Sequence, residues 1–503
     1  MRMEQYKATR PANRRSERNP DPCPLYRKCG GCQLQNLSYP QQLVWKQNQT
    51  ERLLGKFGKV EPILGMKHPY HYRNKVQAAF GQARDKKIIS GVYQSSTHRI
   101  VPVDHCMIED ETADAIIVTV RELMKPFRMQ PYNEHTGTGW LRHLLVKRGF
   151  ASGQVMVVFV AANPIFPAKK RFIETLRSRH PEITTILLNI NPMRTSMVLG
   201  ESERVLFGPG FIEDTLCGCI FRISAKSFYQ INPVQTELLY GQAIAFAGLT
   251  GRETVIDAYC GIGTIGLIAS RKAGQVIGVE SNRDAVRDAI SNAKRNQIRN
   301  TRFFHADAGT FMSGMAQAGE QADVVLMDPP RAGSDEAFLS SIVSLSPEKV
   351  VYISCNPETQ RRDLEFLTRQ GYQVRRIQPV DMFPHTNHVE TVVLLSHKKP
   401  DGHINVKVEF GEGEGKVPLD NIAKRAEEYK PKERVTYKMI KEYIEAKYGF
   451  KVHTSYIAEV KRDLGLPMYD APNAVEELKQ PRKHPTAEKV EAIKDALKYF
   501  EVI

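Results

Sequence analysis

The chain has 503 residues and a formal net charge of +15; 41% of its residues are hydrophobic and 25% are charged. These proportions exclude a fibrous or wholly disordered protein, and the length predicts two to four globular domains. Because the sequence shows neither an apolar run of membrane-spanning length nor an apolar signal core, we expect a cytoplasmic protein without a membrane partner.

The basic surplus is unevenly distributed along the chain. Residues 401–503 contain equal numbers of basic and acidic side chains, so the whole surplus lies in residues 1–400. A surplus of this size in a cytoplasmic protein favours a polyanionic partner, RNA or DNA. The alternative is that the charge serves only to keep the protein soluble.

The first half of the chain divides into two parts. Residues 1–20 are rich in arginine and lack apolar periodicity, which predicts a disordered basic arm. Residues 21–223 have a β-rich pattern that helical stretches interrupt. Val76–Phe80 and Gln154–Val160, for example, have the apolar and β-branched character of strands. Residues 21–223 are therefore expected to form an α+β domain.

Residues 224–397 alternate in a different way. A helical pattern covers Ser227–Ala247, and strand-like runs then recur with helical patterns between most of them. The runs are Thr254–Asp257, Val276–Val279, Ala322–Met327, Lys349–Ile353, Gln373–Ile377 and Val389–Leu395. This alternation predicts a doubly wound parallel sheet, a Rossmann-like fold of the α/β class.

Residues 401–503 begin with a break in pattern at Gly411–Gly415. Three short amphipathic stretches follow and predict a small helical module; they are Val435–Lys447, Ser455–Leu464 and Thr486–Phe500. Thr454–Arg462 is either a nucleic-acid recognition helix or an amphipathic helix packed within the module.

A glycine-rich turn lies at the start of the predicted sheet. Asp257–Gly266 follows a strand-like run, contains three glycines and leads into a helix, so backbone amides there can approach a ligand. Glu280 ends the next run, where a carboxylate can bind ribose hydroxyls. A dinucleotide fingerprint begins with glycine where this turn has Asp257. The pattern therefore favours S-adenosylmethionine (SAM), which carries an amine.

Two polar motifs follow neighbouring strand-like runs. Asp328-Pro-Pro-Arg331 and Ser354-Cys-Asn-Pro357 are expected at one edge of the sheet, because parallel strands end there. The pair predicts covalent catalysis, in which the Cys355 thiolate attacks carbon 6 of a pyrimidine and carbon 5 then takes a methyl group. A base must finally remove the proton from carbon 5. The alternative for Cys355 is a small buried side chain.

Three more cysteines lie close together in the sequence. Cys23, Cys29 and Cys32 fall within ten residues, and Cys106 would supply a fourth thiol. Four thiolates suit an iron–sulfur cluster or a structural zinc ion. Free thiols are the third alternative.

The order of three motifs carries a family resemblance. Asp328-Pro-Pro-Arg331, then Ser354–Gln360, then His388-Val-Glu390 resemble the motifs of the RNA 5-methyluridine methyltransferases. The resemblance covers roughly residues 21–397. It implies that Cys355 is the nucleophile and that Glu390 removes the proton from carbon 5. It further implies SAM contacts at Gln230, Tyr259, Glu280 and Asp328, with Asp307 as a weaker contact on the adenine side.

The same resemblance bears on the cysteines and on the substrate. Their spacing of five and then two residues resembles the [4Fe-4S] site of several family members and favours a cluster over zinc. The branch that carries this site implies 23S ribosomal RNA as the partner of a monomeric enzyme, with transfer RNA as the alternative. The expected domains are an iron–sulfur-bearing, α+β RNA-binding domain (21–223), a SAM-dependent methyltransferase domain (224–397) and a helical extension (401–503).

Three other functions are less consistent with these residues. RNA cytosine-5-methyltransferases usually carry a cysteine directly after the Pro-Pro turn, where this chain has Arg331. An amino-group methyltransferase would have Asp-Pro-Pro-Tyr and would not need Cys355. A non-catalytic RNA-binding protein would need neither Cys355 nor Glu390.

Overall fold

A computed structural model describes residues 18–94, 97, 99–134, 136–193, 197–397, 419–421, 423, 437–464 and 484–499. The chain divides into two compact units, Met1–Tyr429 and Lys430–Ile503. Most of the expected basic arm and the break at 411–415 lie outside the described residues. Across the described ranges, no helix is both long and apolar enough to cross a lipid bilayer. The domain boundaries expected from the sequence stay predictions.

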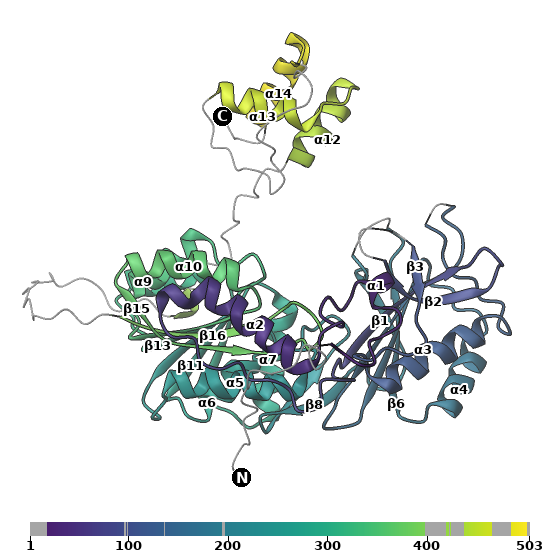
Figure 1. Ribbon diagram of the computed structural model, residues 1–503, viewed down its shortest axis with the longest axis horizontal. Coiled ribbons are helices and arrows are strands. Elements are labelled where there is room, and N and C mark those ends of the chain that lie inside the picture. Colours follow the sequence, from purple (N-terminus) through teal and green to yellow (C-terminus); the bar gives the residue numbers. More distant parts are fainter. Residues whose placement is uncertain are drawn as a thin grey trace, which may run out of the picture. The chain divides into compact units, whose positions relative to one another are not determined.

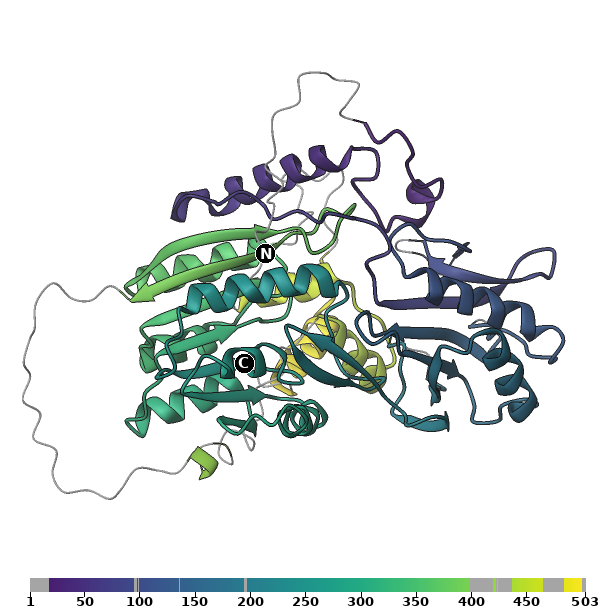
Figure 2. The ribbon, with the colours of Figure 1, turned by 90° about the horizontal axis from the view of Figure 1, so that it is seen from below.

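The first unit begins with two helices, α1 (Tyr26–Cys29) and α2 (Tyr39–Leu54), and a 3₁₀ turn at Gly55–Phe57. A proline in the first turn of α2 favours helix initiation because its fixed φ suits that position. Helix α2 lies beside strand β15 (Tyr372–Val380) and helix α10 (Pro357–Arg369), as Figure 2 shows. The N-terminal segment therefore packs on an element more than 300 residues later in the chain.

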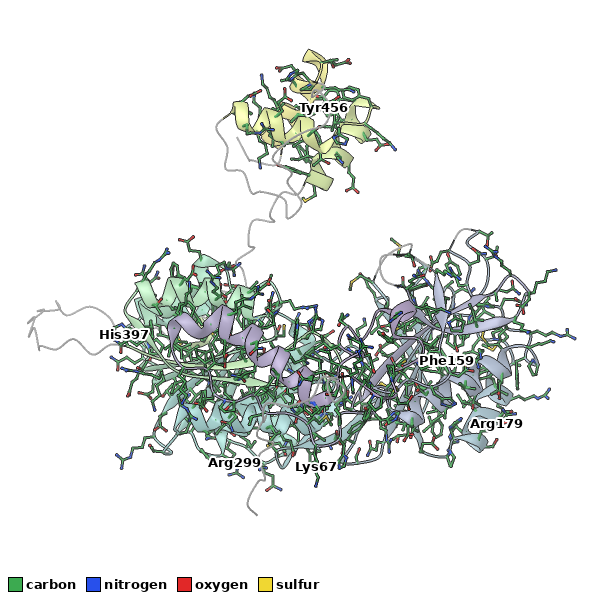
Figure 3. All side chains as sticks on the ribbon, viewed as in Figure 1. Lys67, Phe159, Arg179, Arg299, His397 and Tyr456 are labelled. Carbon is green, nitrogen blue, oxygen red and sulfur yellow. The ribbon has the colours of Figure 1, made fainter. Side chains whose placement is uncertain are left out.

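The first of two seven-stranded sheets has the strand order β3-β2-β1-β4-β5-β6-β7. Its elements are β1 (Lys75–Gln82), β2 (Ile88–Tyr93), β3 (Ile100–Pro102), α3 (Glu111–Met124), β4 (Leu141–Arg148), β5 (Val155–Ala161), α4 (Lys169–Arg179), β6 (Ile183–Ile190) and β7 (Ser202–Phe207). Apolar side chains of α3 and α4 pack on the sheet, and Phe159 of β5 is fully buried among them (Figure 3). A hairpin of β8 (Ile212–Leu216) and β9 (Cys219–Ile223) follows.

The second sheet has the order β12-β11-β10-β13-β14-β16-β15. Its elements are α5 (Pro233–Ala247), β10 (Thr254–Ala258), α6 (Thr264–Ser270), β11 (Gln275–Glu280), α7 (Arg283–Arg295), β12 (Thr301–His305), α8 (Ala308–Gln317), β13 (Val324–Met327), α9 (Glu336–Leu345), β14 (Lys349–Ser354), α10, β15 and β16 (Glu390–His397). The first five strands pair in parallel, whereas β16 is antiparallel to both of its neighbours. The predicted α/β fold is confirmed, with one antiparallel strand added.

Helices cover both faces of the second sheet. Helices α2, α9 and α10 lie on one face, and α5 and α6 lie on the other (Figure 1). One buried cluster contains Met156 and Leu187 of the first sheet together with Val351 and Val392 of the second. The two sheets of the first unit therefore share a hydrophobic core, which stabilises their relative arrangement.

The structure corrects the predicted start of one helix. A helical pattern covers Ser227–Ala247, but α5 begins at Pro233, and Asn232 caps it by accepting the N–H of Gln235 at 3.2 Å. Proline suits the first turn of a helix and disfavours helical φ and ψ in the residue before it. Residues 224–232 are thus a non-helical connection.

The second unit contains α12 (Tyr437–Tyr448), α13 (Thr454–Asp463) and α14 (Ala487–Tyr499). These helices confirm the three predicted helical stretches to within two residues at each end. Their apolar side chains form one core that includes Ile444, Ile457 and Leu497. Because Ile457 and Val460 of α13 lie inside this core, the structure explains the amphipathic pattern of α13 by packing. A recognition role for α13 stays a prediction.

The glycine-rich turn allows a direct test of its packing. A Cβ added at Gly266 would lie 2.6 Å from Oδ2 of Asp257, the atom that accepts the Gly266 N–H at 2.8 Å. Gly266→Ala is therefore expected to lower the free energy of unfolding by about 1–3 kcal/mol, as measured by urea denaturation. Gly241→Ala is the control, because its Cβ would meet nothing within 4 Å on helix α5. Equal stability of the two variants would contradict this account.

Candidate active site

Two reactive side chains lie where two paired strands meet the same edge of the sheet. Ser354, the last residue of β14, pairs with Thr391 of β16; Cys355 directly follows β14 and Glu390 begins β16, and the charge of Glu390 acts on the Cys355 thiol. Asp328 follows β13, whose last residue, Met327, pairs with Tyr352 of β14. The two predicted motifs therefore meet at the same edge of the sheet, as the topology requires.

The surroundings of Cys355 favour the protonated thiol. Burial raises the pKa of Cys355 to about 11, and the carboxyls of Glu390 and Asp328 act in the same direction. Arg331 lowers this pKa by its positive charge. A cation bound beside these carboxyls would also favour the thiolate, which is the reactive form.

Both carboxyls at this edge have raised pKa values, so the protonated form of each is favoured, and each would act as a base only after it loses its proton. Glu390 is 4% exposed, and burial together with the charge of Asp328 raises its pKa well above the usual range. Burial raises the pKa of Asp328 to about 7. Perturbed groups of this kind gather at functional sites, because desolvation and like charges tune acids and bases there.

The loop that bears Asp328 is fixed by the helix that follows Cys355. The carbonyl of Arg331 accepts hydrogen bonds from Nδ2 of Asn356 and Oγ1 of Thr359, both at 3.2 Å. The buried carboxylate of Asp363 accepts the N–H of Ser334 at 2.9 Å. Because these bonds join the loop to α10, they set the position of Asp328 relative to Cys355.

The sequence assigns no function to His388 or Tyr240, and both lie near the reactive pair. Nη2 of Arg331 lies 2.9 Å from Nδ1 of His388, two residues before Glu390. Tyr240 of α5 is buried, and its hydroxyl hydrogen-bonds the side chain of Gln230. Tyr240 occupies an apolar position of a helix, so periodicity alone assigns it to the core.

The glycine turn and Glu280 meet as predicted. The N–H of Gly261 donates to Oε2 of Glu280 at 3.0 Å, and both residues line a cavity of about 570 Å³ that also includes Phe228. Gly263 has a φ of 81°, a left-handed conformation that glycine adopts without strain. Asp257 is buried and accepts the N–H of Gly266, so its carboxylate stabilises the turn itself.

The other expected cofactor residues occupy different surroundings. Gln230 is buried, and its carbonyl accepts Nδ2 of Asn74 at 3.0 Å. Tyr259 has a φ of 66° and packs on Phe338, with ring centroids 4.9 Å apart. Asp307 caps α8 by accepting the N–H of Thr310 at 2.8 Å through Oδ1. A cofactor contact of Asp307 would therefore use an oxygen of a carboxylate that also serves as a helix cap.

Four cysteines surround one cavity in the first unit. Cys23, Cys29, Cys32 and Cys106 line it together with mostly apolar side chains, and all four thiols are free. Burial raises the pKa of Cys32 to about 12. Within the described ranges, no set of three or more His, Cys, Asp or Glu side chains is close enough to hold a single metal ion. The fold thus brings Cys106 to the same cavity as Cys23, Cys29 and Cys32, which lie close together in the sequence.

Comparisons with known proteins agree with this geometry. The family model described as tRNA (Uracil-5-)-methyltransferase matches residues 38–398. An uncharacterized RNA methyltransferase of Halalkalibacterium halodurans is 45% identical over 391 residues, which cover 76% of this chain and 85% of the relative. An uncharacterized RNA methyltransferase of Listeria innocua is 44% identical over 387 residues, with the same two coverages.

A solved structure is similar over most of its length. The crystal structure of Pyrococcus abyssi tRNA (uracil-54, C5)-methyltransferase in complex with S-adenosyl-L-homocysteine has a TM-score of 0.61 and 28% sequence identity. The match covers 73% of this chain and 85% of that one. The family match and the two close relatives together show that this chain belongs to the tRNA (uracil-5-)-methyltransferase family and is a SAM-dependent RNA methyltransferase.

Proposed function

We propose that the protein methylates carbon 5 of a uridine in 23S ribosomal RNA through a covalent bond between Cys355 and the uracil ring. The observation that carries this proposal is that Cys355, Glu390 and Asp328 adjoin paired strand ends at one edge of the sheet, where both carboxyls act on the thiol. A thiol, a buried base and an adjoining carboxylate are the groups that this chemistry needs. One chain supplies all three, which supports a monomeric enzyme.

The reaction divides between these side chains. The Cys355 thiolate adds to carbon 6, and the electron pair of the double bond between carbons 5 and 6 moves toward carbon 5. Carbon 5 then takes the electrophilic methyl group that bound SAM would supply, and the electron pair of the broken carbon–sulfur bond would stay on the donor's sulfur. The Glu390 carboxylate removes the remaining proton from carbon 5. The double bond re-forms as the bond from carbon 6 to sulfur breaks, which releases the Cys355 thiolate and 5-methyluridine.

The proposed cofactor cradle draws on residues at or after the ends of four strands, β10 to β13, and on the segment before α5. Glu280 would bind ribose hydroxyls, because it ends β11 and lines the cavity beside the glycine turn. Asp328 and Gln230 would face the methyl-bearing end, since both lie near Tyr240. Tyr259 and Asp307 follow β10 and β12 and would bind toward the adenine.

The formation of the covalent bond is expected to depend steeply on pH. Because the pKa of Cys355 is about 11, its thiolate fraction below that value rises about tenfold for each pH unit. The rate of adduct formation with RNA containing 5-fluorouridine should therefore rise with pH between about 6 and 9. A pre-steady-state measurement with SAM in excess gives this rate. A rate that stays flat over this range would contradict the protonated resting thiol.

The four cysteines are proposed to hold a [4Fe-4S] cluster. A zinc ion holds four sulfurs about 2.3 Å from one point. A cluster holds its cysteines further apart around a larger volume, which fits four thiols that line one cavity. The four side chains would bind one iron each. In this position a cluster would fix the fold of residues 23–32 against Cys106 and carry no step of the methyl transfer.

The cluster is tested by metal analysis of protein purified without oxygen. We expect about four iron and four sulfide per chain, lost in Cys32→Ala and kept in Cys217→Ala. Cys217 is a suitable control because it is a free, half-buried thiol outside the cavity. One zinc per chain in the unchanged protein would contradict the cluster.

The RNA substrate is tested separately. Positions of 5-methyluridine are mapped in ribosomal and transfer RNA from cells with and without the gene, and the purified protein is assayed on each RNA. Loss of a modification from 23S ribosomal RNA supports the proposal. Transfer RNA is the second candidate, because the similar solved structure is of an enzyme named for uracil-54 of tRNA. If 5-methyluridine were lost from transfer RNA and kept in 23S ribosomal RNA, transfer RNA would replace ribosomal RNA as the proposed substrate.

A further inference from the structure

The loop that leads to Glu390 is held mainly by segments distant in sequence. Residues 381–388, here called the 381–388 loop, join β15 to β16 and end two residues before Glu390. Asp381 and Met382 are fully buried, and His385 is 1% exposed. His385 has a φ of 69°, a left-handed conformation that costs energy in a residue other than glycine. Such a conformation persists only where surrounding contacts impose it.

Backbone groups of the loop pair with residues near the N-terminus. Nζ of Lys46 donates to the carbonyl of Phe383 at 2.9 Å, and the hydroxyl of Tyr72 donates to that of Pro384 at 3.0 Å. Three further hydrogen bonds join backbone groups of the loop to residues 33–42. The Leu34 N–H donates to the carbonyl of His385 at 2.9 Å, the His385 N–H donates to Oε1 of Gln42 at 2.9 Å, and the Asn387 N–H donates to Oε1 of Gln33 at 3.2 Å. Residues 33–46 and Tyr72 thus make five hydrogen bonds to backbone groups of the loop, and we call these residues the brace.

A buried ion pair fixes the first residue of the loop. Nζ of Lys46 lies 2.5 Å from Oδ1 of Asp381, and both side chains are fully buried. The hydroxyl of Tyr39 donates to Oδ2 of Asp381 at 2.8 Å, so both carboxylate oxygens have a partner in the brace. A buried pair satisfied at both ends specifies one arrangement, because any other leaves a charge unpaired in the interior.

The opposite side of the loop contacts the segment that carries Gln230. The carbonyl of Asp381 accepts Nε2 of Gln235, and that of Met382 accepts Nδ2 of Asn232, both at 2.9 Å. The loop is therefore fixed between the brace and the start of α5. A small displacement of the brace would be transmitted to β16 at Glu390, because the loop has a bonded partner on both sides.

We propose that the brace consists of positioning residues for proton removal by Glu390. This inference rests on the proposed function, since it assigns Glu390 the proton of carbon 5. The brace begins directly after Cys32, and Cys32 and Cys106 pack in one apolar cluster with Tyr39 and Tyr72. The four-cysteine cavity and the catalytic base are thereby connected through side chains of this chain alone.

Two variants test the brace without removing a reactive group. Tyr72→Phe deletes the hydroxyl bonded to Pro384, and Gln33→Ala deletes an exposed side chain bonded to Asn387. Tyr372→Phe is the matched control, because Tyr372 is equally buried and its hydroxyl donates to the carbonyl of Pro347. Tyr372 begins β15, at the end opposite to the loop.

The decisive measurement is the fraction of enzyme joined covalently to methylated RNA during turnover with ordinary uridine. In both brace variants we expect this fraction to rise, kcat to fall by about tenfold and the KM for SAM to stay unchanged, since misplaced catalytic groups slow the chemical step. Adduct formation on 5-fluorouridine RNA should match that of Tyr372→Phe. If the brace variants released methylated RNA as fast as Tyr372→Phe does, the positioning role of the brace would be overturned and the proposed function would stand. Failure of the unchanged protein to form any adduct would remove the proposed function as well.

Discussion

Replacement of Cys355 by alanine is expected to abolish methylation and the covalent adduct together. No other described thiol lies beside Glu390 and Asp328, and loss of a nucleophile typically costs about 10⁴-fold or more in kcat. The variant should still bind SAM, because Cys355 is proposed to contact only the uracil. We would measure adduct formation with 5-fluorouridine RNA on a denaturing gel and SAM binding by calorimetry.

Cys217→Ala controls for the loss of a half-buried thiol. Cys217 lies in the turn between β8 and β9, and its N–H donates to Glu237. We expect this variant to form the adduct and to methylate RNA at the rate of the unchanged protein. Full methylation by Cys355→Ala would show that the reaction proceeds without covalent attack, even though the fold and the family would stand.

Replacement of Glu390 by glutamine is expected to stop the reaction after the methyl transfer. Glutamine cannot take the proton from carbon 5, so the methylated RNA should stay bonded to Cys355 and kcat should fall about 10²- to 10⁴-fold. Mass spectrometry of the trapped adduct would find the added methyl group. An adduct that lacks the methyl group would place Glu390 before the transfer and contradict the assigned role.

The same variant is expected to stabilise the protein. The pKa of Glu390 is raised in the folded state, so the folded protein binds this proton more tightly than the unfolded chain does. The contribution of this tighter binding to the free energy of unfolding is fully present below the unfolded pKa of about 4.3. It is lost as the pH rises toward the pKa of Glu390 in the folded protein. Glu390→Gln should therefore raise the melting temperature, and the gain should grow between about pH 5 and 8.

Glu365, a partly exposed glutamate, is expected to show no such gain in melting temperature when it is replaced by glutamine. Lys56 and Arg361 lower the pKa of Glu365, so its ionised form is favoured in the folded protein. Glu365→Gln should leave RNA release unchanged and should not raise the melting temperature at pH 8. Equal melting temperatures for Glu390→Gln and the unchanged protein at that pH would contradict a protonated, buried Glu390.

The sequence predicts those site residues that directly follow parallel strands, because their positions depend only on the order of strands and helices along the chain. Asp328 and Cys355 each follow an apolar run, and parallel strands necessarily end at one edge, so their meeting could be expected. The glycine turn and Glu280 follow the same rule. Only the family resemblance indicates Glu390, because it begins β16, the antiparallel strand of the second sheet, where no general rule places a functional residue.

The parts that the sequence does not predict depend on contacts between distant segments. Lys46 and Asp381 are 335 residues apart, and nothing near either residue indicates a buried ion pair. Tyr240 has the periodicity of a core residue and Tyr72 lies outside every helix and strand, and only the fold shows what their hydroxyl groups contact. The helical pattern of Ser227–Ala247 misplaces the start of α5 for a local reason, because Pro233 occupies the first turn and Asn232 caps the helix.

The pairing of β14 with β16 has a consequence for how this family can vary. Side chains alternate between the two faces of a strand, so a single-residue insertion within β16 would turn Glu390 away from Cys355. The turn at Gly371 between α10 and β15 lies outside this pairing. Natural differences in length between homologues should therefore gather near residue 371 and be absent from β16.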